Sequence, residues 1–119
     1  MLESDLFEIC MACCEGTLDK YDIKWKRGSA VCVILASEGY PANFQKGFII
    51  DGISSLNGIE DAEVLVAGAK RDGEKIVTSG GRVVGVTAFA DTVDEAADKA
   101  YTYSKRITFN NKYYRKDIR

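Results

Sequence analysis

Apolar side chains recur with helical spacing at the start of the chain. They are Leu2, Leu6, Ile9, Cys10 and Cys13, which fall on one face of a helix. Ser4 or Asp5 can cap the beginning of this helix, and Gly16 can end it. The pattern therefore predicts an N-terminal helix. Its apolar face either packs on the sheet described next or belongs with a longer chain.

Apolar runs of strand length occupy the middle of the chain. Ser29–Ala36 is uninterrupted, which predicts a strand buried on both faces. A turn signal at Arg71–Gly73 predicts a hairpin, and residues 47–53 fit either a short strand or a turn. The remaining strands are expected at Asp61–Gly68, at Lys75–Thr78 as its hairpin partner, and from Arg82 to about Ala90.

A second helix is expected after these strands. Thr92 and Glu95 match a capping box, in which each side chain bonds to the other residue's backbone amide. Small residues dominate the helix face that follows: Val93, Ala97, Ala100, Tyr101, Ser104 and Ile107. Tyr113 and Tyr114 in the basic tail predict that the tail folds back. The fold class is therefore α+β: a mainly antiparallel sheet with a C-terminal helix packed on it, plus an N-terminal helix.

Composition restricts the function further. With 119 residues the chain can form a hydrophobic core, and its net charge of −2 does not favour nucleic-acid or membrane-surface partners. No apolar run approaches a membrane span and the first residues are acidic, so a cytoplasmic protein without a signal peptide is expected. The chain has no histidine, which removes the commonest general base and metal ligand.

The cysteines are better explained as core residues than as a metal or redox site. Cys10 and Cys13 form a CxxC pair, but Cys14 and Cys32 are not spaced as a second pair. The pair also lies inside the predicted N-terminal helix, where cysteine commonly packs as a small apolar residue. No metal site is expected.

Two adjacent glycines and an arginine precede the longest apolar run. Gly80 and Gly81 permit a positive φ or a close backbone approach, and Arg82 supplies a guanidinium at the first position of the strand. Such a loop can hold a phosphate or carboxylate. It can equally be a tight turn, which is the commoner use of paired glycines.

Several segments together resemble one family. Ala30–Pro41 (AVCVILASEGYP), Gly80–Ala88 (GGRVVGVTA) and Tyr114–Ile118 (YRKDI) are similar to the C-terminal part of the phosphoribosylamine–glycine ligases. These enzymes, also called glycinamide ribonucleotide synthetases, belong to the ATP-grasp class. Leu2–Leu6 (LESDL) resembles the stretch just after their metal- and ATP-binding signature, so the likeness extends over essentially the whole chain.

The resemblance implies an organisation and an activity. Residues 1–28 would be the end of the ATP-grasp region, and residues 29–119 the C-terminal domain. The full enzyme joins glycine to 5-phosphoribosylamine in de novo purine biosynthesis, with ATP and Mg²⁺ or Mn²⁺ as cofactors. The nucleotide and metal lobes of the family lie before this segment, so the chain alone is expected to be inactive and to carry no cofactor. Its partners would be those lobes and the small-molecule substrates.

The same resemblance assigns a binding site. Arg82, the hydroxyl of Ser79 and the amides of Gly80 and Gly81 would bind the 5′-phosphate of phosphoribosylamine, and no catalytic residue is expected here. Alternatively, Arg82 is a structural cation that pins the tail or an adjoining lobe. A different class of function also stays open, that of a free-standing module that binds an anion or a protein partner.

Other conspicuous residues have structural explanations. Glu38 could orient a substrate hydroxyl, but a rigid turn with Tyr40 packed is favoured, and Trp25 is expected to be a packing anchor. The chain departs from the family pattern at Val66–Ala69, where the family often has His-Ala-Gly-Thr, and at Arg119, where it usually has Gly.

Overall fold

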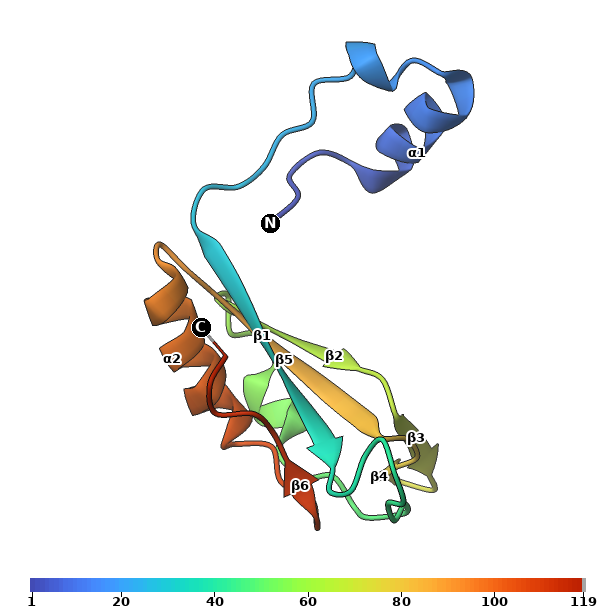
Figure 1. Ribbon diagram of the computed structural model, residues 1–119, viewed down its shortest axis with the longest axis vertical. Coiled ribbons are helices and arrows are strands. Elements are labelled where there is room, and N and C mark those ends of the chain that lie inside the picture. Colours follow the sequence, from blue (N-terminus) through green and yellow to red (C-terminus); the bar gives the residue numbers. More distant parts are fainter. Residues whose placement is uncertain (119) are drawn as a thin grey trace.

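The computed structural model describes residues 1–118, and the departure at Arg119 lies outside them. Two α-helices, two short 3₁₀ helices and six strands follow one another along the chain (Figure 1). In order they are α1 (Leu6–Glu15), η1 (Leu18–Lys20), β1 (Ser29–Ser37), η2 (Ile53–Leu56), β2 (Ala62–Val66), β3 (Ala69–Asp72), β4 (Lys75–Thr78), β5 (Arg82–Ala90), α2 (Val93–Ser104) and β6 (Lys112–Tyr113). The predicted α+β class is confirmed.

The main sheet has four strands in the order β2-β5-β1-β6, all antiparallel to their neighbours. The predicted hairpin is wrong in one respect, because β4 pairs with β3 in a separate two-stranded sheet, whereas β2 pairs with β5. Residues 47–53 form no strand. They contribute isolated bridges from Ile49 to Val77 and from Asp51 to Thr108.

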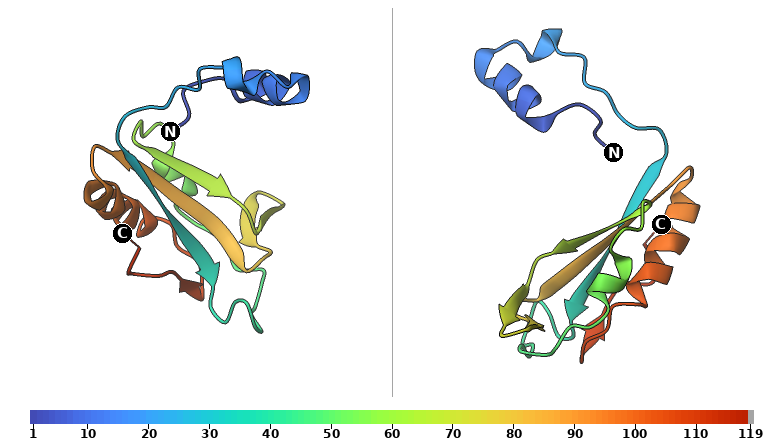
Figure 2. Two further views of the ribbon diagram at one scale, coloured as in Figure 1. Left: turned by 45° about the horizontal axis from the view of Figure 1, so that its top comes forward. Right: turned by 180° about the vertical axis from the view of Figure 1, so that it is seen from behind.

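Helix α2 covers one face of the main sheet, as the two views in Figure 2 show. Burial in β1 alternates along the strand, so the prediction that both of its faces are buried is wrong. Leu35 is fully buried beneath α2, whereas Ile34 on the opposite, open face is 42% exposed. An apolar run can therefore mark a strand with one uncovered face as well as a doubly covered one.

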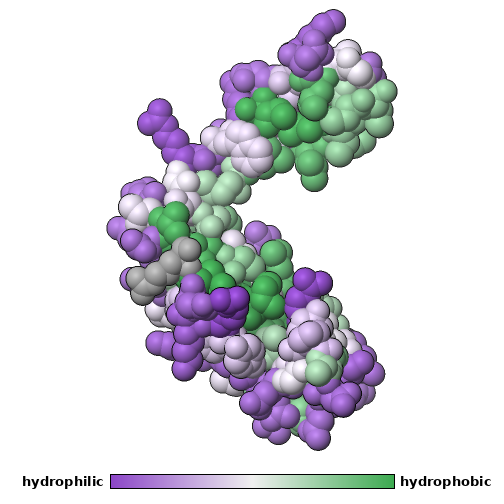
Figure 3. Space-filling view, viewed as in Figure 1, coloured by the Kyte–Doolittle hydropathy of each residue, from purple (hydrophilic) through white to green (hydrophobic). Residues whose placement is uncertain are grey.

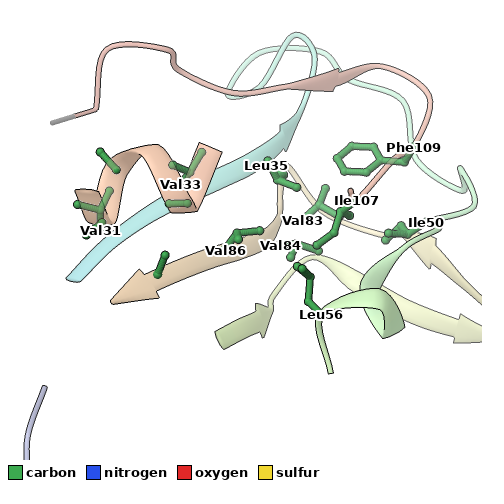
Figure 4. Packing of buried hydrophobic residues seen from close by; sticks show 14 residues of the cluster. Val31, Val33, Leu35, Ile50, Leu56, Val83, Val84, Val86, Ile107 and Phe109 are labelled. Carbon is green, nitrogen blue, oxygen red and sulfur yellow. The ribbon is translucent and has the colours of Figure 1, made fainter. Parts of the chain in front are cut away.

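The core lies between the sheet, α2, the segment around η2 and the segment that follows α2. Figure 4 shows Leu35, Val84, Ile107 and Leu56 gathered there. The alanines of α2 have no exposed surface, so the helix lies close to the strands. Small residues on this face permit that close approach, as the sequence pattern predicts, but Val93, which was expected on the same face, is 48% exposed.

Both ends of α2 are held by specific contacts. The capping box is present: the Glu95 amide donates to the Thr92 hydroxyl, and the Glu95 carboxylate accepts from the Thr92 amide. After the helix, Lys112 Nζ donates to the carbonyls of Ser104 and Ile107 at 3.2 and 2.6 Å. A cation at a helix C-terminus satisfies carbonyls that lack intrahelical partners. Partial burial lowers the pKa of Lys112.

The tail folds back on α2, as predicted. The Tyr101 hydroxyl donates to the Arg115 carbonyl at 3.1 Å and accepts from the Ile118 amide at 2.8 Å. Tyr114 packs beside Tyr101, with their ring centroids 6.2 Å apart. The tail thus packs beside α2 and against the edge of the core.

Residues 1–27 form an arm that stands away from the sheet (Figures 1 and 2). Helix α1 is capped by Asp5 and ends at Gly16 in the left-handed region, as predicted. Its apolar side chains Leu6 and Phe7 are exposed, and Figure 3 shows the apolar surface over α1. The helix does not pack on the described sheet.

Two expectations for this arm are wrong. Trp25 is 63% exposed and is therefore not a packing anchor. The thiols of all four cysteines are exposed and free, so none of them is a core residue. For Trp25 and the three cysteines of α1, the expectation assumed that the arm packs against the domain, whereas its backbone hydrogen bonds, such as Glu3 to Lys24, stay within the arm. Cys32 lies outside the arm, in β1, and is exposed on the open face of the sheet.

An ionic cluster joins α2 to the start of β2. Lys99 Nζ lies 2.6 Å from one carboxylate oxygen of Asp61, and the Tyr103 hydroxyl donates to the other at 2.9 Å. The bond from Lys99, and then that from Tyr103, lowers the pKa of Asp61 below its usual value of 3.8. A carboxyl with a lowered pKa stabilises the fold above its unfolded pKa, and this stabilisation is lost as pH falls through the lowered value.

Replacing Asp61 with asparagine should therefore reduce stability in a pH-dependent way. We expect Asp61→Asn to be less stable than the parent near neutral pH. The difference in stability should shrink well below pH 3.8, where Asp61 is protonated in both the folded and the unfolded parent. Urea unfolding of the variant and the parent, near neutral pH and well below pH 3.8, measures the two differences. Asp19→Asn, at an exposed position in η1, is the matched control. A difference in stability that does not change with pH would contradict the assignment.

No helix in residues 1–118 is long and apolar enough to cross a membrane.

Candidate functional site

The segment Ser79–Gly81 crosses the chain at Gly68. The amides of Ser79 and Gly80 both donate to the Gly68 carbonyl, at 2.7 and 3.0 Å. On the other side, Ser37 donates its amide to the Gly81 carbonyl at 2.8 Å and its hydroxyl to the Gly80 carbonyl at 3.1 Å. The segment is therefore fixed from both sides by hydrogen bonds within the domain.

The glycines are required by packing rather than by backbone conformation. Neither Gly80 nor Gly81 has a positive φ. A Cβ at Gly81 would overlap the ring of Tyr40, and a Cβ at Gly80 would lie 3.0 Å from the Gly68 Cα. The close approach predicted from the glycines is thus made by the domain's own residues.

Arg82 follows this crossing and reaches the open face of the sheet. Leu35 pairs with Val84, but Ala36 pairs with Arg82, so β5 carries one extra residue in a β-bulge. Ala36 alternates with buried Leu35 and therefore lies on the open face, and its direct partner Arg82 lies there too. Without the bulge, Arg82 would share the buried face of Val84.

The Arg82 side chain is exposed, which suits it to meet an anion. Within residues 1–118, its guanidinium has no carboxylate within ion-pair distance and no hydrogen-bond partner. An exposed guanidinium can bind a phosphate or carboxylate through two parallel N–H bonds.

The predicted four-residue anion site is only partly available to a ligand. The Gly80 amide is already bonded to Gly68, and Gly81 is buried beneath Tyr40, so these backbone amides do not face a ligand. Arg82 and the half-buried hydroxyl of Ser79 remain. The glycines instead fix the start of β5, and with it the position of Arg82.

The sequence pattern did not identify Tyr40 as the side chain that covers the glycine pair. Phe44 packs edge-on to Tyr40 with ring centroids 5.8 Å apart, and Lys46 lies over the Phe44 ring. The loop after β1 and the start of β5 therefore lie at one end of the molecule (Figure 1). The ring of Tyr40 packs on Gly81, as the favoured explanation expects, but Tyr40 remains 43% exposed and is therefore only partly packed.

The described residues offer no cluster of metal ligands. In that part of the chain, no group of three or more cysteine, aspartate and glutamate side chains is arranged to hold a metal ion. The CxxC thiols belong to α1, away from the open face on which Arg82 lies.

Comparisons with known proteins agree with the fold. Residues 30–119 match the family described as "Phosphoribosylglycinamide synthetase, C domain". A phosphoribosylamine–glycine ligase of Pasteurella multocida is 42% identical over 98% of this chain and 27% of its own length. The corresponding ligase of Escherichia coli O157:H7 is also 42% identical, again over 98% of this chain and 27% of its own.

A solved structure has the same fold. The crystal structure of a phosphoribosylamine–glycine ligase from Thermotoga maritima superposes with a TM-score of 0.74 at 32% identity, over 94% of this chain and 28% of that one. The chain thus spans little more than a quarter of the length of these relatives. On the match over residues 30–119, the chain belongs to the phosphoribosylglycinamide synthetase C-domain family.

Proposed function

We propose that this chain is the C-terminal domain of a cytoplasmic phosphoribosylamine–glycine ligase of purine biosynthesis. In the proposed reaction, ATP phosphorylates the carboxylate of glycine and leaves as ADP. The amine of 5-phosphoribosylamine then attacks the acyl carbon, the C–N bond forms, and phosphate leaves. Such a reaction depends on positioning and charge neutralisation more than on a side-chain nucleophile, which fits a domain without histidine.

Arg82 is the residue of this domain that we assign to the substrate. The observation that carries the assignment is an exposed guanidinium, placed on the open face by a bulge and left without an acidic partner in residues 1–118. Its proposed ligand is the 5′-phosphate of the ribosylamine, with the Ser79 hydroxyl as a second contact. The glycine pair supports Arg82 and does not contact the phosphate.

The nucleotide and metal belong to the other part of the proposed enzyme. ATP and Mg²⁺, or Mn²⁺, would be bound by the ATP-grasp lobes, since residues 1–118 offer no cluster of metal ligands. We further propose that residues 1–28 are the end of those lobes and residues 29–119 the C-terminal domain. The exposed apolar side chains of α1 support this division, because they do not pack on the described sheet.

A hybrid enzyme tests the proposal. This chain would replace the matching C-terminal part of the Escherichia coli ligase, which is 42% identical to it. We expect ADP formation that requires both glycine and 5-phosphoribosylamine, and no activity from the truncated ligase alone. A second hybrid, built on the Pasteurella multocida ligase, controls for a mismatched junction. Two folded but inactive hybrids would contradict the proposed function.

A free-standing binding module is the second candidate, and the exposed apolar face of α1 favours it because such a face can contact a protein partner. This candidate predicts that hybrids are inactive. It also predicts that the isolated chain binds simple anions and sugar phosphates equally well.

A further inference from the structure

A hollow of about 460 Å³ lies beside the end of β1, and no residue of the proposed phosphate site lines it. The loop that follows β1 forms one wall, and the turn that precedes β6 forms the other. Its lining residues are Glu38, Gly39, Asn43, Phe44, Gln45 and Asn111. A carboxylate, three carboxamides and an aromatic ring therefore surround one space.

Local backbone geometry shapes the two walls. Gly39 has a φ of +92°, and the position of its missing Cβ is occupied by the Asn43 carbonyl, so the loop folds tightly on itself. Asn111 adopts a left-handed conformation with a φ of 61°, which asparagine tolerates better than most residues. The Glu38 amide donates to the Asn111 carbonyl at 2.8 Å and joins the two walls.

The polar side chains of the hollow are available to a ligand. Within residues 1–118, the side chains of Glu38, Asn43, Gln45 and Asn111 have no hydrogen-bond or ion-pair partner. A carboxylate accepts hydrogen bonds, and a carboxamide both donates and accepts them. Neighbouring hydroxyl groups on a small ring match this set, and the half-buried Phe44 ring adds an apolar surface for the ring carbons.

The hollow lies at the same end of the sheet as Arg82. The bond from Glu38 to Asn111 continues the pairing of β1 with β6, in which Ser37 pairs with Lys112. Glu38 begins the turn that follows β1, two residues beyond Ala36, the partner of Arg82. Phe44 contacts Tyr40, whose ring in turn covers Gly81, the residue before Arg82. The polar hollow and the Arg82 cation therefore lie close to the same loop.

We propose that this hollow binds the sugar hydroxyls of a pentose 5-phosphate whose phosphate lies on Arg82. The inference rests on the proposed function, because that function supplies the phosphate site. Glu38 accepts hydrogen bonds from the hydroxyls, and the carboxamides of Asn43 and Asn111 complete the contact. Glu38 lies in a turn, as the sequence favoured, and the proposal adds a ligand role to it.

Titration of the ¹⁵N-labelled 119-residue chain with ribose 5-phosphate tests the proposal. Asparagine and glutamine side-chain amides give their own signals in proton–nitrogen spectra. We expect ribose 5-phosphate to shift the side-chain amides of Asn43, Gln45 and Asn111 together with the Arg82 signals. Inorganic phosphate should shift only the signals of Ser79–Arg82.

Substitutions separate the two parts of the site. Glu38→Ala and Asn43→Ala should each weaken ribose 5-phosphate binding at least tenfold, towards the affinity of inorganic phosphate, and leave phosphate binding unchanged. Glu15→Ala, which removes an exposed glutamate at the end of α1, changes net charge equally and should have no effect. Dispersed spectra of each variant establish that it is folded.

Each outcome decides a separate point. Equal affinities and identical shifts for ribose 5-phosphate and inorganic phosphate would overturn the hollow and leave the Arg82 site intact. Shifts in the hollow without shifts at Arg82 would support the hollow and contradict the phosphate assignment. No shift with ribose 5-phosphate at millimolar concentration would overturn the hollow, while the activity of the hybrids would still decide the ligase proposal.

Discussion

Replacing Arg82 with alanine is expected to raise the KM for 5-phosphoribosylamine in the hybrid ligase about ten- to a hundredfold. A charge-assisted hydrogen bond of this kind contributes roughly 1.5–3 kcal/mol. Because Arg82 contacts only the proposed phosphate, the KM for ATP should stay nearly unchanged. Steady-state kinetics with each substrate varied in turn measures both constants.

Two further variants make this result specific. Arg82→Lys keeps the charge but loses the planar pair of donors, so we expect an intermediate KM. Arg71→Ala removes an exposed cation from β3 and should have no effect on either KM. An unchanged ribosylamine KM in Arg82→Ala would refute the substrate role and leave Arg82 as a structural cation.

The second large effect concerns the core. Leu35→Ala should lower the free energy of unfolding by about 2–5 kcal/mol, because it leaves a cavity at a fully buried position beneath α2. Ile34→Ala removes a side chain of the same size from the neighbouring position on the open face. We expect it to cost less than about 1 kcal/mol, since that side chain is 42% exposed.

Urea unfolding of the two variants and the parent measures the difference. Equal destabilisation would mean that the open face is covered in solution, for example by a second copy of the chain. Sedimentation at several protein concentrations tests directly for such a second copy. The pair of variants therefore tests the one-sided burial of β1 directly.

Local signals in the sequence were sufficient for several elements. The capping box at Thr92 fixed the start of α2, and the glycines before Arg82 marked the start of β5. Asp5 and Gly16 likewise bound α1. Each of these features depends on hydrogen bonds or backbone preferences within a few residues, which a sequence displays directly.

Features that depend on distant partners were not predictable in the same way. Tertiary packing decides that β2 pairs with β5 rather than with β4, because both of these strands are apolar and long enough to pair with it. The exposure of Trp25 and of the three cysteines in α1 follows from the position of the arm, which no local pattern encodes. The strand period likewise could not show which face of β1 would remain open.

The candidate site was predictable in part. The sequence identified Arg82 and its neighbouring glycines, but it assigned the backbone amides to a ligand, whereas the Gly80 amide is bonded to Gly68. Nothing in the sequence brought Glu38 and Asn111 together, since they are joined by the pairing of β1 with β6. Only the register of the sheet could reveal that contact.

Because of the bulge opposite Ala36, the face on which Arg82 lies depends on the number of residues in β1 and β5 at this point. Inserting one residue between Leu35 and Ala36 would give Val83 a partner, restore regular pairing and turn the guanidinium towards the interior, although every residue of the proposed phosphate and sugar contacts would still be present. A homologue that keeps this arginine but is one residue longer in β1 at this point would therefore carry its charge on the buried face. When related chains are aligned, the length of β1 opposite Val83 should be judged together with the identity of the arginine.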